Sequence, residues 1–322
     1  MRLRKRTTRN IAATIVAAAC AFFLQRAGAA EIPDGEHSGP AIWRVRSAES
    51  TVYLFGSIHI LPAGFGWTTK PIADAMASSD SFIFEVPVGK DSLAEERGFI
   101  IQNGLLPRRQ SLRALLSPGE FDLYASVMRN AGLNPAEYEH YRPWLAALVL
   151  GLAYLHPDNL TALKGADDEI MDYAHSHERE LSYLETPLQQ LELLTAGTER
   201  SQLAGLRNLI NTLPGSRNLE QSLRDAWARG DADGLTALLD RVFRGSPKAQ
   251  DFLVGRRNRL WLPAINSALQ RPGSTMITVG AAHIGGMSGL IALVCSEGYR
   301  VERLPDAGGE SDACSPAAET EH

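Results

Sequence analysis

The chain has 322 residues, of which 44% are hydrophobic and 21% charged, a composition typical of a globular protein with a sizeable core. Its net charge of −5 becomes −11 without residues 1–30, because that segment holds six basic and no acidic residues and leaves 26 basic against 37 acidic ones. An acidic surface of this kind argues against nucleic acid or an anionic membrane as a partner.

The N-terminal segment has the layout of a secretory signal peptide. Residues 1–10 are rich in arginine, Ile11 to Leu24 is an apolar run, and Ala27-Gly-Ala-Ala30 supplies small residues for cleavage. The alternative, a retained membrane anchor, fits less well because the run is shorter than the about 20 residues that span a bilayer. We therefore expect a periplasmic or secreted protein with no membrane span in the mature chain.

The mature chain begins with the pattern of a β-hairpin followed by a strand–helix–strand unit. Residues 41–55 predict the hairpin, which leads into the loop Gly56-x-x-His59. A helix is expected from Lys70 to about Ser78, and the strand after it ends at Glu85. Strands joined by so short a crossover helix are expected to pair in parallel.

Two large helical insertions are expected, at about residues 91–165 and 200–270. The first holds Trp144 to Leu155, the longest apolar run of the mature chain, which is too short to cross a bilayer and predicts a buried helix. Between the insertions, a strand from Leu181 is expected to end at Glu185.

The C-terminal part predicts a strand, a glycine-rich turn, a helix and a returning strand. The strand leads into a second loop of the same form, Gly280-x-x-His283. We expect one α/β domain over residues 31–305, followed by a disordered tail at residues 306–322, which lacks apolar content. Cys295 and Cys314 either form one disulfide or remain two thiols.

Four expected strands thus end on an ionisable residue. These are two histidines in matched loops and two glutamates: His59, His283, Glu85 and Glu185. Ligands of open α/β sheets bind beyond the carboxyl ends of the strands, and a catalytic metal needs about three side-chain ligands of these types. The pattern predicts a metal site at the strand ends, although a single strand-end histidine is more often a hydrogen-bonded loop residue.

Other polar groups have ordinary interpretations. Asp167 and Asp168 are expected to begin a helix rather than to bind a ligand. Residues 256–259 carry three arginines that predict a solvated face, with one arginine turned inward as the alternative. Serine-hydrolase, nucleotide-binding and paired-cysteine motifs are absent from the sequence.

Several short motifs follow one another along the mature chain. They are Tyr53-Leu-Phe-Gly-Ser-Ile-His-Ile-Leu-Pro62, Phe84-Glu85, Arg142-Pro-Trp144, Gly165-x-Asp167, Leu184-Glu-Thr186 with Gln189, Arg257-Asn258, Val279-Gly-Ala-Ala-His-Ile-Gly-Gly286 and Gly298-Tyr. Taken together, these motifs resemble the TraB/GumN family, the group that includes the TIKI metalloproteases. The first loop departs from the family pattern in having Ser57 where threonine is common.

The resemblance implies an erythromycin-esterase/ChaN-like α/β fold, with a central mixed or parallel sheet and a divalent-metal hydrolase site. It implies manganese or cobalt as the metal, with zinc as a further option. Carried over residue by residue, it points to His59, Glu85 and His283, supported by Glu185, Arg257 and Asn258.

Our hypothesis is a metal-dependent hydrolase that acts as a peptidase or on a small-molecule substrate. His59, His283 and one glutamate would hold the metal, the other glutamate would accept the proton of the attacking water, and Arg257 would orient the substrate. The choice between Glu85 and Glu185 for the two roles is open. The alternative is a non-catalytic protein that binds a peptide, iron or haem in the same cleft.

Overall fold

The computed structural model describes residues 39–62, 64–87, 93–130, 132–155, 164–213, 217–243, 250–305 and 311–314. The expected signal peptide lies outside these residues. The chain divides into two compact units, which we call the sheet unit and the helical unit. The sheet unit comprises Ala29–Glu85, Lys164–Leu184 and Ser222–His322, and the helical unit contains Val86–Leu163 and Glu185–Gln221.

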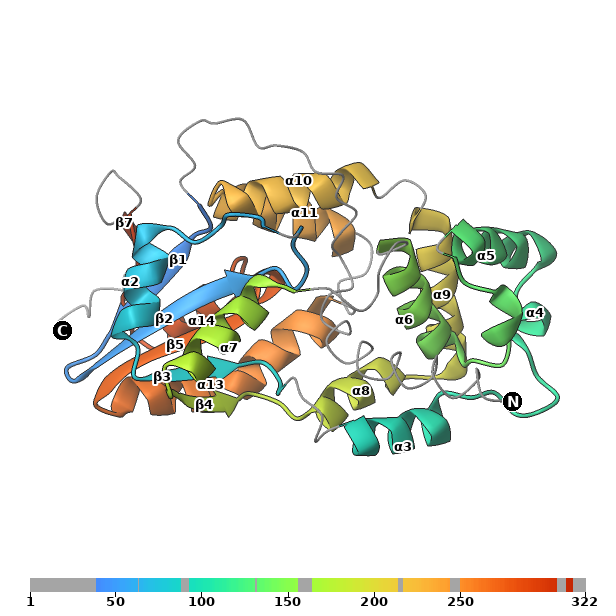
Figure 1. Cartoon of the computed structure of the whole chain (residues 1–322), viewed down its shortest axis with the longest axis horizontal. Helices are drawn as coiled ribbons and strands as arrows, with labels where there is room; N and C mark the ends of the chain where they lie inside the picture. Colours follow the sequence, from blue (N-terminus) through green and yellow to red (C-terminus); the bar gives the residue numbers. More distant parts are fainter. Residues whose placement is uncertain are drawn as a thin grey trace, which may run out of the picture. The chain divides into compact units, whose positions relative to one another are not determined.

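The sheet unit is built on a seven-stranded mixed sheet of order β4-β3-β5-β2-β1-β6-β7 (Figure 1). Strands β4, β3, β5 and β2 pair in parallel, whereas β1, β6 and β7 pair antiparallel to their neighbours. The predicted α/β class with a mixed sheet is therefore confirmed. The strands are β1 (Ile42–Arg46), β2 (Ser50–Ser57), β3 (Ser81–Phe84), β4 (Glu180–Tyr183), β5 (Gly273–Gly280), β6 (Val301–Arg303) and β7 (Ser311–Cys314).

Strand β5 lies at the centre of the parallel part of the sheet. It pairs with β2 over eight residues, from Ser50↔Gly273 to Ser57↔Gly280, and with β3 on its other side. Its sequence, Gly-Ser-Thr-Met-Ile-Thr-Val-Gly, is buried from Thr275 onward, as expected for a parallel strand covered on both faces. The strands that lead to His59, Glu85 and His283 are thus three neighbours in one sheet.

Helices of the sheet unit cover both faces of this sheet. The predicted helix after Thr69 is confirmed as α2, and Pro71 sits in its first turn, where no backbone donor is needed. The remaining helices include a π-helical turn η3 and a 3₁₀ turn η4. Their bounds are α2 (Lys70–Ser78), α7 (Ala166–Ser176), α10 (Arg217–Ala228), α11 (Ala232–Phe243), η3 (Asp251–Gly255), α13 (Arg256–Gln270), η4 (Ala281–His283) and α14 (Leu290–Ser296).

The helical unit contains the predicted buried apolar helix. This helix, α6, packs against α5 and α9. At the start of α5 the Ser117 backbone N–H donates to Glu120 Oε2 at 2.7 Å, which confirms the predicted helix start. Among the described residues no helix is long and apolar enough to cross a membrane. The helices are α3 (Leu93–Asn103), α4 (Leu112–Leu115), α5 (Pro118–Asn130), η1 (Pro135–Glu137), α6 (Pro143–Leu155), α8 (Pro187–Thr195) and α9 (Glu199–Thr212).

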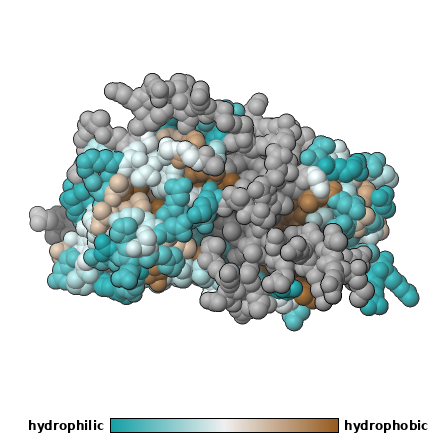
Figure 2. All heavy atoms as spheres, in the orientation of Figure 1, coloured by the Kyte–Doolittle hydropathy of each residue, from teal (hydrophilic) through white to brown (hydrophobic). Residues whose placement is uncertain are grey.

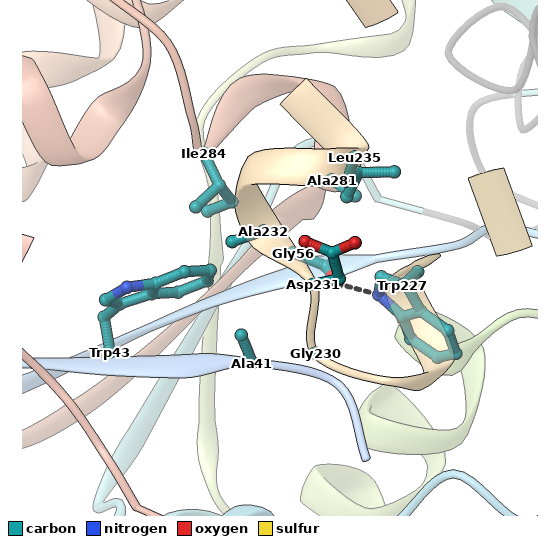
Figure 3. Close-up of a pocket in the computed structure, with 10 residues that line it drawn as sticks. All are labelled: Ala41, Trp43, Gly56, Trp227, Gly230, Asp231, Ala232, Leu235, Ala281 and Ile284. Carbon is teal, nitrogen blue, oxygen red and sulfur yellow. Dashed lines mark hydrogen bonds between the residues drawn. The ribbon is translucent and has the colours of Figure 1, made fainter. Parts of the chain in front are cut away.

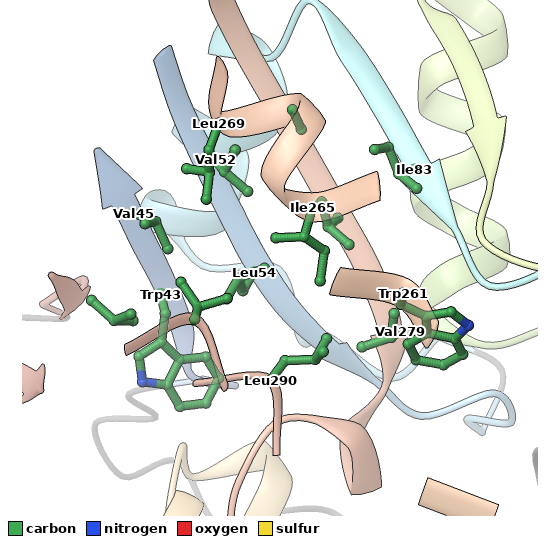
Figure 4. Close-up of a cluster of buried hydrophobic side chains, with 14 of the residues drawn as sticks. Trp43, Val45, Val52, Leu54, Ile83, Trp261, Ile265, Leu269, Val279 and Leu290 are labelled. Carbon is green, nitrogen blue, oxygen red and sulfur yellow. The ribbon is translucent and has the colours of Figure 1, made fainter. Parts of the chain in front are cut away.

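One predicted insertion differs from the structure. Helix α13, expected within the insertion at residues 200–270, belongs to the sheet unit because its apolar face packs on the strands. Figure 4 shows Trp261, Ile265 and Leu269 of α13 against Leu54 and Val279 of the sheet. This packing fixes the start of α13, which carries Arg257 and Asn258, relative to the strand ends.

The expected disordered tail contains a strand. Residues 311–314 form β7, the edge strand beside β6, and Cys314 is disulfide-bonded to Cys295 of α14. The sequence of β7, Ser-Asp-Ala-Cys, gives no hydrophobic signal, so pairing with β6 and the disulfide define this strand.

The face of the sheet unit that Figure 2 draws is mostly polar. On the face drawn in Figure 2, hydrophilic side chains cover much of this unit and apolar ones form small, separate patches. The large apolar side chains most exposed in the described residues are scattered rather than clustered in one segment, at Ile101, Leu105, Tyr183, Leu260 and Met287. Single exposed apolar residues of this kind are normal for soluble proteins.

Candidate active site

Three strand ends of the sheet unit converge on Gly280. A Cβ atom added at this glycine would lie 3.1 Å from His59 Nε2, 3.2 Å from Glu85 Oε1 and 3.8 Å from His283 Cδ2. The convergence follows from the strand order, because β5 carries Gly280 and is flanked by β2 and β3. The space that a side chain would occupy is therefore shared by both histidines and one glutamate.

The glycines of the two Gly-x-x-His loops permit close approach rather than an unusual backbone conformation. Neither Gly56 nor Gly280 is among the described residues with positive φ. A Cβ at Gly56 would lie 3.0 Å from the Cα of Ala281 and 2.9 Å from Ile284 Cγ1. The glycine of the first loop thus makes room for the second loop, and that of the second loop makes room for the converging side chains.

The ring of His59 is oriented by a carboxylate on the first turn of α7. His59 Nδ1 donates to Asp167 Oδ2 at 2.9 Å, which leaves Nε2 facing the space at Gly280. Nε2 is buried and has no hydrogen-bond partner among the described residues. The neighbouring Asp168 accepts from the Gly165 backbone N–H at 2.8 Å. Both aspartates lie in the first turn of α7, as predicted, and Asp167 in addition engages His59.

The ring of His283 is oriented by Asn258 at the start of α13. The Asn258 Nδ2 group donates to the carbonyl oxygens of His283 and Ser288 at 3.0 and 2.7 Å, so its Oδ1 faces the ring and accepts from His283 Nδ1 at 2.6 Å. Nδ1 therefore carries the proton, and Nε2 of the neutral ring has the lone pair. Metal-bound histidines in proteins usually donate the other ring N–H to an oxygen acceptor such as a carboxylate or a carbonyl.

Arg257 hydrogen-bonds to both Glu85 and His283. Its Nη2 donates to Glu85 Oε2 at 2.7 Å and its Nη1 to His283 Nε2 at 3.0 Å, while Glu85 Oε1 accepts from the Gly280 N–H at 2.6 Å. The side chains of Arg257 and Glu85 are only 6% and 5% exposed. The guanidinium carbon lies 4.8 Å from the centre of the Trp261 ring, within cation–π range. The helix is π-helical just before Arg257, a feature frequent at functional sites.

The two histidines have opposite protonation states. Burial lowers the pKa of His59, but the charge and hydrogen bond of Asp167 outweigh this and raise that pKa to about 9. Burial lowers the pKa of His283 to about 3, and the nearby Arg257 contributes to the lowering against the pull of Glu85. At neutral pH the site therefore combines a cationic His59 with a neutral His283, and His59 Nε2 would have to lose its proton before it could bind a metal.

The side chains of this cluster are of the types that bind divalent cations. Two imidazole nitrogens and a carboxylate oxygen face one space, both rings have their outer nitrogens engaged, and His59 Nε2 lacks a partner among the described residues. Within the same residues, however, no group of three or more such side chains forms a ready-made metal site. The guanidinium of Arg257 is hydrogen-bonded to Glu85 and His283.

Comparison with known protein families identifies the family of this chain. The TraB/PrgY/gumN family model matches residues 41–303, which include every side chain of this cluster. The chain belongs to the TraB/PrgY/gumN family. No curated protein and no solved structure matched it.

Other predicted residues of this TraB/PrgY/gumN chain are not among the three side chains nearest to Gly280. Glu185 is half-buried and follows β4, which is separated from β5 by β3, and it is the first residue of a segment of the helical unit. Arg256 and Arg259 are exposed, as expected for a solvated face. Asp167 was expected only as a helix-start residue, and the signal for its contact with His59 is the motif Gly165-x-Asp167, whose glycine packs on the His59 backbone.

A small cavity of about 20 Å³ lies behind the second loop. Ala281 and Ile284 line it from one side of the 3₁₀ turn, and Trp227 lines it beside its hydrogen bond to the Gly56 carbonyl (Figure 3). A larger cleft of about 790 Å³ shares these two loop residues and extends to the disulfide. None of His59, Glu85 or His283 lines either space, so the candidate site is separate from both.

Proposed function

We propose that this protein is a divalent-metal-dependent hydrolase, acting as a peptidase outside the cytoplasm. The observation that carries the proposal is the convergence of His59 Nε2, Glu85 Oε1 and the His283 ring on the space at Gly280. The hydrogen bonds of Asp167 and Asn258 to the two Nδ1 atoms support it, since they orient both rings with Nε2 inward.

Each side chain of the cluster has a distinct part in this proposal. When bound, a divalent ion polarises a substrate carbonyl and makes water nucleophilic near neutral pH. His59, Glu85 and His283 would hold it, in line with the manganese or cobalt implied by the family resemblance. Arg257 would orient a substrate carboxylate or steady the developing oxyanion. The role of Glu185 as proton acceptor stays a prediction.

Two independent features support the proposed location, periplasmic or secreted. The segment 1–30 has the layout of a signal peptide. The bond between Cys295 and Cys314 is of a kind that persists in oxidising compartments and is rare in the cytosol. We expect a bacterial host to remove this N-terminal segment, which mass spectrometry would measure. We also expect the host to export the chain from the cytoplasm, which cell fractionation would measure.

The function is tested with the mature chain, stripped of metal by chelation and reloaded with Mn²⁺, Co²⁺ or Zn²⁺. We expect the loaded protein to cleave members of a peptide library, and we expect His59→Ala and His283→Ala to lose both bound metal and cleavage. His175→Ala is the matched control, because His175 is an exposed histidine on α7. Metal content by mass spectrometry gives a readout independent of turnover.

Two results would contradict the hydrolase. One is equal, negligible metal in the wild type and in both histidine variants. The other is stoichiometric binding of intact peptide with no cleaved product under any metal, which would favour the alternative of a non-catalytic binder.

A further inference from the structure

We propose that Trp227 is a positioning residue, which fixes the point where the two Gly-x-x-His loops meet and so sets the places of His59 and His283. It acts through the backbone of Gly56, where the first loop begins, and not on a reacting atom. Its effect on metal binding rests on the proposed function, whereas its effect on the two histidine rings can be measured without a metal.

The carbonyl of Gly56 lies where the pairing of β1 with β2 has ended. The last pair of that ladder is Ile42 with Phe55, so Gly56 has no β1 partner among the described residues. Trp227 Nε1 of α10 donates to the Gly56 carbonyl at 2.6 Å, in a buried hydrogen bond. A buried carbonyl that loses its donor is costly. The indole of Trp227 therefore takes the place of a strand neighbour at this position.

Gly56 is also the residue at which the two loops touch. A Cβ atom added there would lie 3.0 Å from the Cα of Ala281 and 2.9 Å from Ile284 Cγ1. These two residues stand on either side of His283 in the chain, and Gly56 itself lies three residues before His59. Because protein interiors are close-packed, a shift of the Gly56 peptide would be passed to both histidines.

Trp227 is itself held on two sides. Its ring centre lies 6.3 Å from that of Phe55 and 6.1 Å from that of Trp67. The end of α10 is attached to the sheet, because Arg303 Nη2 of β6 donates to the Gly230 carbonyl at 2.6 Å. Figure 3 shows the indole nitrogen directed at Gly56. The ring is therefore fixed well enough to hold the backbone that it contacts.

Two matched substitutions separate positioning from stability. Trp227→Phe removes the indole N–H at Gly56, and Trp144→Phe removes one from the helical unit, where Trp144 Nε1 donates to the Asn103 carbonyl at 2.9 Å. Both should unfold at lower urea concentration, since each leaves a carbonyl without its donor.

Nuclear magnetic resonance of chelator-treated protein with isotope-labelled histidine reports the two rings directly. We expect the Cε1–H signals of both His59 and His283 to move in Trp227→Phe and to stay at their wild-type positions in Trp144→Phe. His59→Ala and His283→Ala identify the two signals, because each variant lacks one of them.

Calorimetric titration with Mn²⁺ measures the consequence for the proposed metal site. We expect Trp227→Phe to bind Mn²⁺ about tenfold more weakly than the wild type, and Trp144→Phe to stay within about twofold, because losing a group that orients a ligand weakens metal binding. Unmoved ring signals and wild-type Mn²⁺ affinity in Trp227→Phe would overturn the inference and leave the hydrolase intact. Moved ring signals with no Mn²⁺ binding by any of the proteins would overturn the hydrolase and leave the positioning role.

A second variant covers the case in which Trp227→Phe folds poorly. Replacing Trp227 with 3-benzothienylalanine keeps the shape and stacking of the indole ring and removes only its N–H. We expect this protein to show the same displaced signals of His59 and His283. Wild-type positions for both signals would overturn the inference, because the hydrogen bond to Gly56 would then have no part in placing the histidines.

Discussion

At the scale of single residues, the site depends on which atom of each ring faces inward. Asp167 and Asn258 engage the outer nitrogens of His59 and His283, and this is what directs both Nε2 atoms to the space at Gly280. The sequence predicted that the two histidines and Glu85 belong to the site, because each follows a local hydrophobic run that marks the end of a strand. The contact of Asp167 could not be predicted in the same way, because its local sequence is that of a helix start.

The space at Gly280 can be tested by filling it. In Gly280→Ala the backbone can keep its conformation, with φ −55° and ψ 139°, but the new methyl group lies 3.1 Å from His59 Nε2 and 3.2 Å from Glu85 Oε1. We expect metal affinity and peptide cleavage to fall by about tenfold or more, while the free energy of unfolding falls by about 1–3 kcal/mol. Calorimetry with Mn²⁺ and urea unfolding measure the two effects separately.

Gly66→Ala is the control for this substitution, because a Cβ at that exposed position meets no atom within 4 Å. It should leave metal affinity and cleavage unchanged. An unaltered Mn²⁺ affinity in Gly280→Ala would show that the ion does not bind at this point.

At the scale of secondary structure, prediction succeeded where the signal was local. The hairpin, the helix after Thr69 and the strand before Gly280 all formed, because turn residues, a proline in the first helical turn and buried β-branched runs specify them. Strand β4 ends at Tyr183 rather than at Glu185, and this shift was not visible in the sequence. Strand β7 was missed since only its partners, β6 and Cys295, make it a strand.

The pairing of β1 with β6 makes stability depend on pH. Glu302 of β6 accepts from Arg44 of β1, which lowers the pKa of Glu302 below its ordinary value of 4.5, with help from the charges of Arg46 and Arg300. Because the folded pKa is the lower one, this stabilisation is present above pH 4.5 and is lost as the pH falls through the folded pKa. We expect Glu302→Gln to lose about 1–2 kcal/mol at pH 7.

Urea unfolding of the wild type and Glu302→Gln at pH 7 and at pH 3 measures this difference. The gap between the two proteins should narrow at the lower pH, where the wild-type carboxylate also becomes protonated. If the difference in unfolding free energy stays constant or widens on acidification, the stabilisation does not come from the charge of Glu302.

At the scale of the whole chain, the donors come from segments far apart in sequence. His59 and His283 are more than two hundred positions apart, yet Gly280 lies beside both His59 and Glu85. The family match at residues 41–303 covers all of these segments but ends before β7 and Cys314. The disulfide is therefore a stabilising element outside the matched region.

Loss of this disulfide should lower stability without altering the site. The bond joins residues 19 positions apart, and removing a constraint on a loop of this length typically costs about 2–4 kcal/mol. We expect Cys314→Ser, made in a chain of residues 31–322, to unfold at lower urea concentration while retaining its metal affinity. A reductant should lower the urea midpoint of the wild type to that of Cys314→Ser and should leave the midpoint of Cys314→Ser unchanged. Equal midpoints for both proteins, with and without reductant, would contradict the prediction.

The continuous ladder between β2 and β5 also sets the spacing of the two imidazoles. Each strand residue advances about 3.3 Å, so a ladder shifted by one step would move one histidine past the other by more than a metal–ligand bond length. The same step would turn alternate side chains to the opposite face of the sheet. The pairing of β2 with β5 therefore fixes the distance between the two histidines. An insertion within either strand would disrupt the site far more than an insertion in the loops that join the helices.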